Sequence, residues 1–94
     1  MAAYAMVHIE VNDAEEYAKY SELAGLAVAQ YNGEFLARGG ECFQMEGKGR
    51  ARNVIIKFAD MASAKTFYHS PEYQKALSYG IPAAARSYTF VEGV

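Results

Sequence analysis

The chain has 94 residues, a formal net charge of −2, 52% hydrophobic residues and 21% charged residues. These values predict one globular domain over residues 1–94 and exclude a disordered segment, which would be poorer in apolar side chains. Nucleic acid is not an expected partner, because phosphate binding needs clustered Lys and Arg and the one basic run, residues 48–52, lies in a glycine-containing turn.

The chain shows no pattern of a membrane or secreted protein. No apolar run approaches the length needed to cross a bilayer, and the N-terminus lacks the pattern of a secretory signal. The single cysteine, Cys42, excludes an internal disulfide and is typical of a small hydrophobic strand residue. We therefore expect a cytoplasmic protein that makes no membrane contact.

The first third of the chain is predicted to form a strand and then a helix. Residues 4–11 alternate between apolar side chains and a mixed set, as in a strand with one buried face. Asp13 begins a capping-box pattern, and helical spacing continues over residues 14–31. Gly33 supplies the stop, and Gly25 would let this helix pack closely on a sheet.

The middle of the chain is predicted to form two antiparallel strands. Residues 34–45 have the pattern of a long strand, interrupted at Gly39 and Gly40, where paired glycines mark a bulge or a close backbone approach. A turn at residues 46–49 leads to a second strand at residues 53–58. This connection is too short for a crossover helix, so the two strands should pair antiparallel.

The last third is predicted to form a helix in two pieces and a final strand. The first piece covers residues 61–68, with Asp60 as its N-cap candidate. The second begins after Ser70, an N-cap followed by proline at the first helical position. We expect the second piece to end around residue 80, a loop at residues 81–82, and a strand at residues 87–92.

The order β-α-β-β-α-β is typical of the α+β ferredoxin-like fold, a four-stranded antiparallel sheet with both helices on one face. The other sheet face is expected to carry Tyr4, Met6, His8, Arg38 and Ile55. Such a face is too apolar to lie bare on a small protein. Packing against an identical sheet would cover it and enclose a partly polar hollow, so we predict a homodimer built as an α/β barrel.

Three motifs resemble one family over essentially the whole chain. Residues 33–40, the run Phe-Tyr-His-Ser-Pro-Glu-Tyr-Gln at residues 67–74, and residues 91–94 are similar to domain-of-unknown-function family thirteen-thirty (DUF1330). The resemblance implies a dimeric α/β barrel in a bacterial cytosol and implies no established activity. Related barrels include cofactor-free monooxygenases, lactone isomerases and haem-handling enzymes, by analogy of fold alone. Relatives are expected to carry Asn at position 69, so no role for His69 follows from the resemblance.

Arg38 is the first candidate ligand-binding residue. Its guanidinium, next to the backbone N–H groups of Gly39 and Gly40, can hold a carboxylate or an enolate, although an ion pair with a glutamate is an equal alternative. Ser70 and Tyr73 begin a helix, where unpaired N–H groups favour an anion. The alternative for these two is that the serine caps the helix and the tyrosine packs.

His69 and His8 are the candidate proton-transfer groups, because imidazole titrates near neutral pH. His69 lies at the break between the helical pieces, whereas a lone histidine on a sheet face, such as His8, is more often a hydrogen-bonded core residue. The spacing of the histidines and the cysteine predicts no metal site, and no cofactor is expected. Two functions remain: a cofactor-free enzyme for an acidic or enolisable small molecule, and a non-catalytic module that binds a small anionic metabolite or supports assembly. RNA binding is a distant third.

Overall fold

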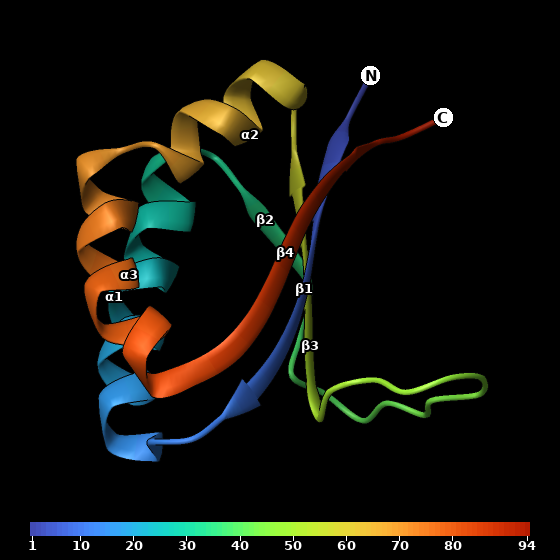
Figure 1. The fold of residues 1–94 in the computed structure, drawn as a ribbon. Helices are drawn as coiled ribbons and strands as arrows, with labels where there is room; N and C mark the ends of the chain where they lie inside the picture. Colours follow the sequence, from blue (N-terminus) through green and yellow to red (C-terminus); the bar gives the residue numbers. More distant parts are fainter.

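The computed structural model describes residues 1–94 and shows a four-stranded antiparallel sheet with three helices on one face (Figure 1). The strand order is β2-β3-β1-β4. The elements are β1 (Ala3–Val11), α1 (Ala14–Gln30), β2 (Glu34–Arg38), β3 (Arg52–Phe58), α2 (Met61–Tyr68), α3 (Pro71–Ala83) and β4 (Ala84–Glu92). The predicted ferredoxin-like fold and the two-piece second helix are confirmed.

Each helix begins at the N-cap that the sequence predicted. Asp13, Asp60 and Ser70 accept hydrogen bonds from the backbone N–H three residues later, at 3.2, 2.7 and 3.1 Å. Such bonds satisfy N–H groups that have no partner within the helix. No helix in the chain has both the length and the apolar character that crossing a bilayer requires.

The predicted long strand over residues 34–45 is wrong. β2 ends at Arg38, and residues 39–51 leave the sheet as an arm that projects away from the helices (Figure 1). The turn begins at Gly39, whose φ of +72° lies in the left-handed region that glycine adopts without strain. Because the arm leaves the plane of the sheet, Cys42 is exposed and is not the strand residue that was expected.

The boundary between α3 and β4 also differs from the prediction. The helix continues to Ala83 through the expected loop, with Pro82 in its last turn, and β4 begins at Ala84 instead of residue 87. The carbonyl oxygen of Ala83 accepts hydrogen bonds from the N–H groups of Asn12 and Asp13, at 2.7 and 3.0 Å. This contact with the start of α1 fixes the end of α3, and the local turn signal at residues 81–82 does not reveal it.

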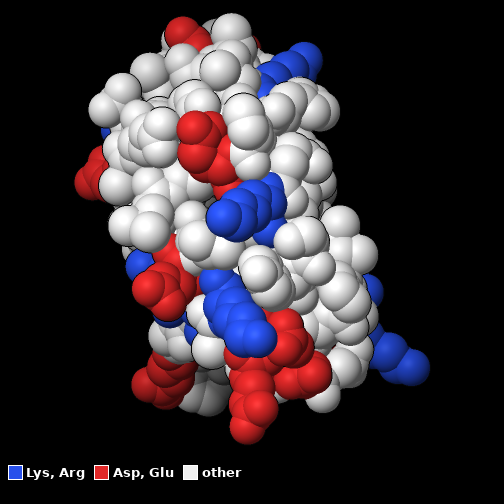
Figure 2. Space-filling view, turned by 90° about the vertical axis from the view of Figure 1, so that its left-hand side faces the viewer, with Lys and Arg blue, Asp and Glu red and all other residues white.

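The two faces of the molecule differ in charge. Acidic and basic side chains are interspersed over the helical side, as expected of a surface in water (Figure 2). The face of the sheet away from the helices, which we call the open face, has two Lys or Asp/Glu side chains among its paired positions on β3, β1 and β4. These are Lys57 beside Tyr4 and Glu10 beside Ala85, at opposite ends of the face, and its middle has none. The open-face residues on these strands are Tyr4, Met6, His8, Glu10, Asn53, Ile55, Lys57, Ala85, Ser87, Thr89 and Val91.

Two helix glycines make room for side chains of the core, and their substitution should have opposite effects. A Cβ at Gly80 would lie 2.6 Å from Cδ1 of Tyr20, a buried ring that has no space to move. We expect Gly80→Ala to lower the free energy of unfolding by about 1–3 kcal/mol, although alanine favours the helix. At Gly25 the nearest atom is Nη2 of the exposed Arg38, at 2.9 Å.

The Arg38 side chain can shift, so we expect Gly25→Ala to raise the free energy of unfolding by up to about 1 kcal/mol. Urea denaturation followed by circular dichroism, at one fixed protein concentration, measures both changes. Equal effects of the two substitutions would contradict the packing described for Tyr20.

Candidate functional site

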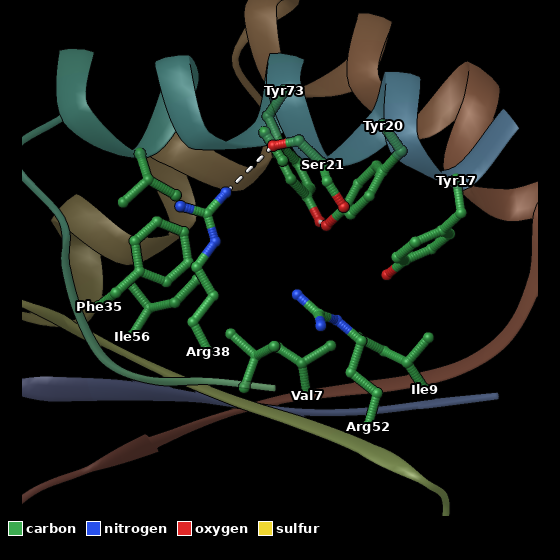
Figure 3. Close-up of a pocket in the computed structure, with 13 residues that line it drawn as sticks. Val7, Ile9, Tyr17, Tyr20, Ser21, Phe35, Arg38, Arg52, Ile56 and Tyr73 are labelled. Carbon is green, nitrogen blue, oxygen red and sulfur yellow. Dashed lines mark hydrogen bonds between the residues drawn. The ribbon is translucent and has the colours of Figure 1, made fainter. Parts of the chain in front are cut away.

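A cavity between the helices and the sheet gathers aromatic and arginine side chains (Figure 3). Ten of its thirteen lining residues are hydrophobic, counting tyrosine, and the other three are Ser21, Arg38 and Arg52. Its volume of about 30 Å³ has room for roughly two water molecules. No carboxylate lines it, so both charged groups of the lining are cations.

Arg38 enters this cavity because β2 contains a bulge. Phe35 and Ala37 pair with consecutive residues of β3, which leaves Leu36 as an extra residue. One extra residue reverses the alternation of side chains between the two faces, so Phe35 and Arg38 both face the helices. The prediction that Arg38 lies on the open face is therefore wrong, and the hollow that contains Arg38 lies within one chain.

Arg38 lies at the mouth of the cavity and is lightly held. Its Nη2 donates a hydrogen bond to the backbone oxygen of Ser21 at 3.2 Å, and its guanidinium lies 4.2 Å from the ring centroid of Phe35. The residue is exposed, so this single bond competes with water. The side chain can therefore leave the mouth at little cost.

Arg52, at the start of β3, is the second arginine of the cavity, and Gly39 packs against it. A Cβ at Gly39 would collide with the Arg52 guanidinium, so position 39 needs glycine for space as well as for its φ. The N–H of Gly39 donates to the backbone oxygen of Asn53 at 2.9 Å, and Gly40 is exposed with no neighbour near its Cα. The Gly39 N–H is therefore already bonded within the chain and is not free for a ligand beside Arg38.

Arg86 of β4 is a third arginine, bonded to the tyrosines that line the cavity. Its Nη2 donates to the hydroxyl oxygens of Tyr20 at 2.7 Å and Tyr73 at 3.2 Å, and these two hydroxyls lie 2.8 Å apart. The only ion pair in the chain joins Lys19 to Glu16, so no carboxylate neutralises Arg86. A largely buried guanidinium without an acid is unusual, because desolvation of the charge is normally compensated.

Three buried polar atoms in this region have no hydrogen-bond partner: Tyr17 Oη, Tyr88 Oη and Arg86 Nε. Tyr17 packs on Tyr20 with ring centroids 4.9 Å apart, and Arg86 lies over the Tyr20 ring at 4.5 Å. Burial raises the pKa of Tyr20 and of Tyr88, so both phenols are neutral at physiological pH. The region thus offers cations and neutral hydroxyl donors, a set that suits a negatively charged group.

Two of the predicted site residues meet at this cavity, and Ser70 does not. Tyr73 lines the cavity and is 1% exposed, and Arg38 reaches it from β2. Ser70 Oγ accepts from Tyr73 N at 3.1 Å and donates to the Phe67 oxygen at 2.6 Å, so it caps α3 and has no donor left for a ligand.

The histidines lie away from the cavity. His8 is on the open face, where its Nδ1 lies 2.6 Å from Oδ1 of Asn53. His69 is exposed at the end of α2, with its ring centroid 5.4 Å from that of Tyr68. Proton transfer by either one remains a prediction that no contact with the cavity supports. No group of three or more His, Cys, Asp or Glu side chains is placed to hold a metal ion.

The sequence contains a signal for the two arginines that the prediction missed. Arg52 has the same strand parity as the buried Val54 and Ile56, and Arg86 has the same parity as Tyr88. A cation that continues the apolar side of a strand must face the core, where it needs an anionic partner. Arg52 was assigned to the basic run of the turn, and its place on a strand was not considered.

The family model of a domain of unknown function, DUF1330, matches residues 2–94. No curated protein sequence matches the chain. Among solved structures, RPA0582 of Rhodopseudomonas palustris, a protein of unknown function, has a TM-score of 0.79 and 15% identity, with 99% of this chain and 82% of that chain covered.

Two further structures have the same fold. A dimeric ferredoxin-like protein of unknown function from Jannaschia sp. CCS1 has a TM-score of 0.80 and 14% identity, with 99% of this chain and 100% of that chain covered. SnoaB, a cofactor-independent oxygenase from Streptomyces nogalater, has a TM-score of 0.62 and 8% identity, with 99% and 93% covered. At these identities the likeness shows the fold alone.

Proposed function

The chain belongs to the domain-of-unknown-function family DUF1330, and from this premise we propose that it binds a small organic anion in the cavity between α1 and the sheet, in the bacterial cytoplasm that the family resemblance implies. One observation carries the proposal: Arg38 and Arg52 line an apolar cavity that has no carboxylate, and Arg86 donates to two tyrosines of its lining. Since buried cations are normally paired, the ligand supplies the negative charge. A carboxylate or enolate accepts the bidentate bonds that guanidinium groups donate.

The same charge distribution supports a reaction. Cations within a few ångströms of a bound carbon acid or phenol favour its ionised form and so lower its pKa. The neutral hydroxyl of Tyr17, which has no partner in the protein, can donate to the developing oxyanion. The proton leaves to solvent, since no histidine or carboxylate lines the cavity. The enolate is then reprotonated at another carbon, which gives an isomer, or it transfers one electron to dioxygen and combines with the superoxide formed, which gives a hydroperoxide after protonation by solvent. The proposed scheme uses no metal or organic cofactor.

Binding requires the mouth to open. A volume of about 30 Å³ is too small for an organic acid, whose pocket usually exceeds about 300 Å³. Arg38 is the side chain whose displacement costs least, because it is exposed and has one hydrogen bond to the backbone. We propose that Arg38 moves aside and then binds the anion from the mouth.

Titration with two probes tests this proposal. Benzoate, measured by calorimetry, should bind, and benzyl alcohol, which has no charge, should not. Benzoylacetone, an enolisable diketone, should ionise in the site with a pKa lowered by about 1–3, because opposite charges within 4–6 Å produce shifts of this size. Arg38→Met should weaken benzoate binding about tenfold by removing a charge-assisted hydrogen bond.

Lys75→Met is the matched control, because it removes one positive charge from an exposed position of α3. Its benzoate affinity should equal that of the unchanged protein. Equal binding of benzoate and benzyl alcohol, or full retention of binding in Arg38→Met, would refute the assignment of this cavity.

The alternative function is a module that binds the anion without turning it over. The same arginines support this function, which differs from the enzyme because the bound anion undergoes no reaction. It predicts benzoate binding with no change in the pKa of benzoylacetone and no consumption of dissolved oxygen, whereas the enzyme shows the pKa change and either oxygen uptake or isomer formation.

We also propose that a second copy covers the open face. Met6 is 40% exposed and Val91 is 44% exposed on this face, and its charged side chains on β3, β1 and β4, Lys57 and Glu10, lie at opposite ends of it. An apolar face of this kind is typical of a protein interface. The Jannaschia relative is described as dimeric, which supports the same assembly here. Sedimentation velocity at micromolar concentration should give twice the mass of one chain, and a stable monomer would refute this assembly.

A further inference from the structure

The arm, residues 39–51, is an extended segment with little support from its own chain. Twelve of its thirteen residues are exposed, among them Phe43 at 78% and Met45 at 86%. Outside the helices and strands, the only backbone hydrogen bond between the arm and the body is that of Gly39 N with the Asn53 oxygen. The Asn53 side chain of β3 adds two bonds to the base of the arm, to the Arg50 oxygen at 3.2 Å and to Cys42 Sγ at 3.4 Å. Two large apolar side chains on a segment held by so few contacts indicate that the arm contacts another surface.

The arm projects from the side of the molecule that carries the open face (Figure 1). A polar recess lies between the two, lined by His8 and Ser87 of the open face and by Gln44, Lys48, Gly49 and Arg50 of the arm. A molecule that covers the open face at His8 therefore also meets the arm. This continuity makes the second copy of the chain the occupant to consider.

The arm has an acidic half and a basic half. Glu41 and Glu46 lie in the outgoing half with the two exposed apolar side chains, and Lys48 and Arg50 lie in the returning half. The recess contains these two basic residues and no acid. In a twofold dimer every contact is made twice, so one acidic half and one basic recess on each copy form two matching contacts.

We propose that, in the homodimer inferred above, the acidic half of each arm docks in the basic recess of the other copy. The arm begins directly after Arg38 and ends directly before Arg52, the two arginines of the cavity. Docking at the far end of the arm therefore fixes both strand ends from which these guanidinium groups extend. Each anion site is complete only when the partner copy holds the arm.

Charge reversal tests the docking in a way that separates it from the dimer itself. In Glu41→Lys/Glu46→Lys both halves of the arm are basic, and in Lys48→Glu/Arg50→Glu both are acidic. Each double variant alone should dimerise at least about tenfold more weakly at low salt, because attraction is replaced by repulsion at two contacts. An equimolar mixture should form mixed dimers in preference to either homodimer, as measured by native mass spectrometry.

Met6→Glu, which places a charge at the centre of the open face opposite Ile55, is the reference variant. If Met6→Glu dissociates the dimer while both arm variants dimerise normally, the proposed dimer is supported and the proposed docking of the arm is wrong. If the unchanged protein is a monomer, the dimer and the docking are both wrong. Absence of any preference for mixed dimers also overturns the docking.

Benzoate affinity provides a second readout of the arm. None of the four substituted residues lines the cavity, so a purely local role for the arm leaves benzoate binding unchanged. We expect each double variant, at concentrations where it is monomeric, to bind benzoate about tenfold more weakly and the mixture to recover the affinity. Unchanged affinity in the monomeric variants would overturn the link between the arm and the cavity.

Discussion

Replacing Arg86 by methionine is expected to weaken benzoate binding by about 10- to 100-fold, because a hydrogen bond to a charged group contributes about 1.5–3 kcal/mol. The substitution should not destabilise the fold. Arg86 is a largely buried cation without a carboxylate, so its removal relieves a desolvation cost. Tyr20 and Tyr73 keep their mutual hydrogen bond of 2.8 Å and are not left unpaired. We therefore expect the free energy of unfolding to stay within about 1 kcal/mol of its present value or to rise.

Calorimetric titration and urea denaturation of the same preparation measure the two effects. Lys75→Met again controls for the loss of one positive charge, and it should change neither quantity. The informative result is the combination of lost binding and retained stability. A variant that unfolds readily while it still binds benzoate would show that Arg86 serves the fold and not a ligand.

Phe67→Ala is expected to have the largest effect on stability of any single truncation in the core, a loss of about 3–5 kcal/mol. Phe67 is fully buried in α2, and its ring centroid lies 4.5 Å from that of Tyr73 and 5.0 Å from that of Phe58. It therefore joins α2 to both α3 and β3. Since domains of this size are stable by about 5–15 kcal/mol in total, the variant should be close to unfolding.

Leu26→Ala is the matched control, because Leu26 lies on α1 with 64% of its surface exposed. Its free energy of unfolding should change by less than about 0.5 kcal/mol. Urea midpoints at one protein concentration compare the two variants. Similar midpoints would mean that α2 does not pack on the core as described.

The local features of the fold were predictable from the sequence because they depend on residues a few positions apart. Asp13, Asp60 and Ser70 could be identified as N-caps from the patterns around them, and all three cap helices. The side of β1 that carries Val7 and Ile9 could be assigned to the core from simple alternation. The order of the elements then favoured one topology.

The candidate site was only partly predictable, since its position depends on one residue of β2. Arg38 and Tyr73 were singled out, but Arg38 was placed on the open face because regular alternation was assumed through Leu36. The bulge reverses that alternation and brings Arg38 under α1. Bulges follow from how two strands pair, and no local pattern in residues 34–38 specifies this one.

The sequence by itself determined the order of the elements, the helix starts and the apolar side of β1, because capping and alternation act between near neighbours in the chain. Only the tertiary structure decided where the charge lies. Arg86 meets Tyr20 and Tyr73, which are 66 and 13 positions away, and their hydroxyls converge because α1 and α3 cover the same face of the sheet. Contacts between such distant residues arise from packing, and this packing places Arg38 and Arg52 at one cavity and Arg86 against its tyrosines.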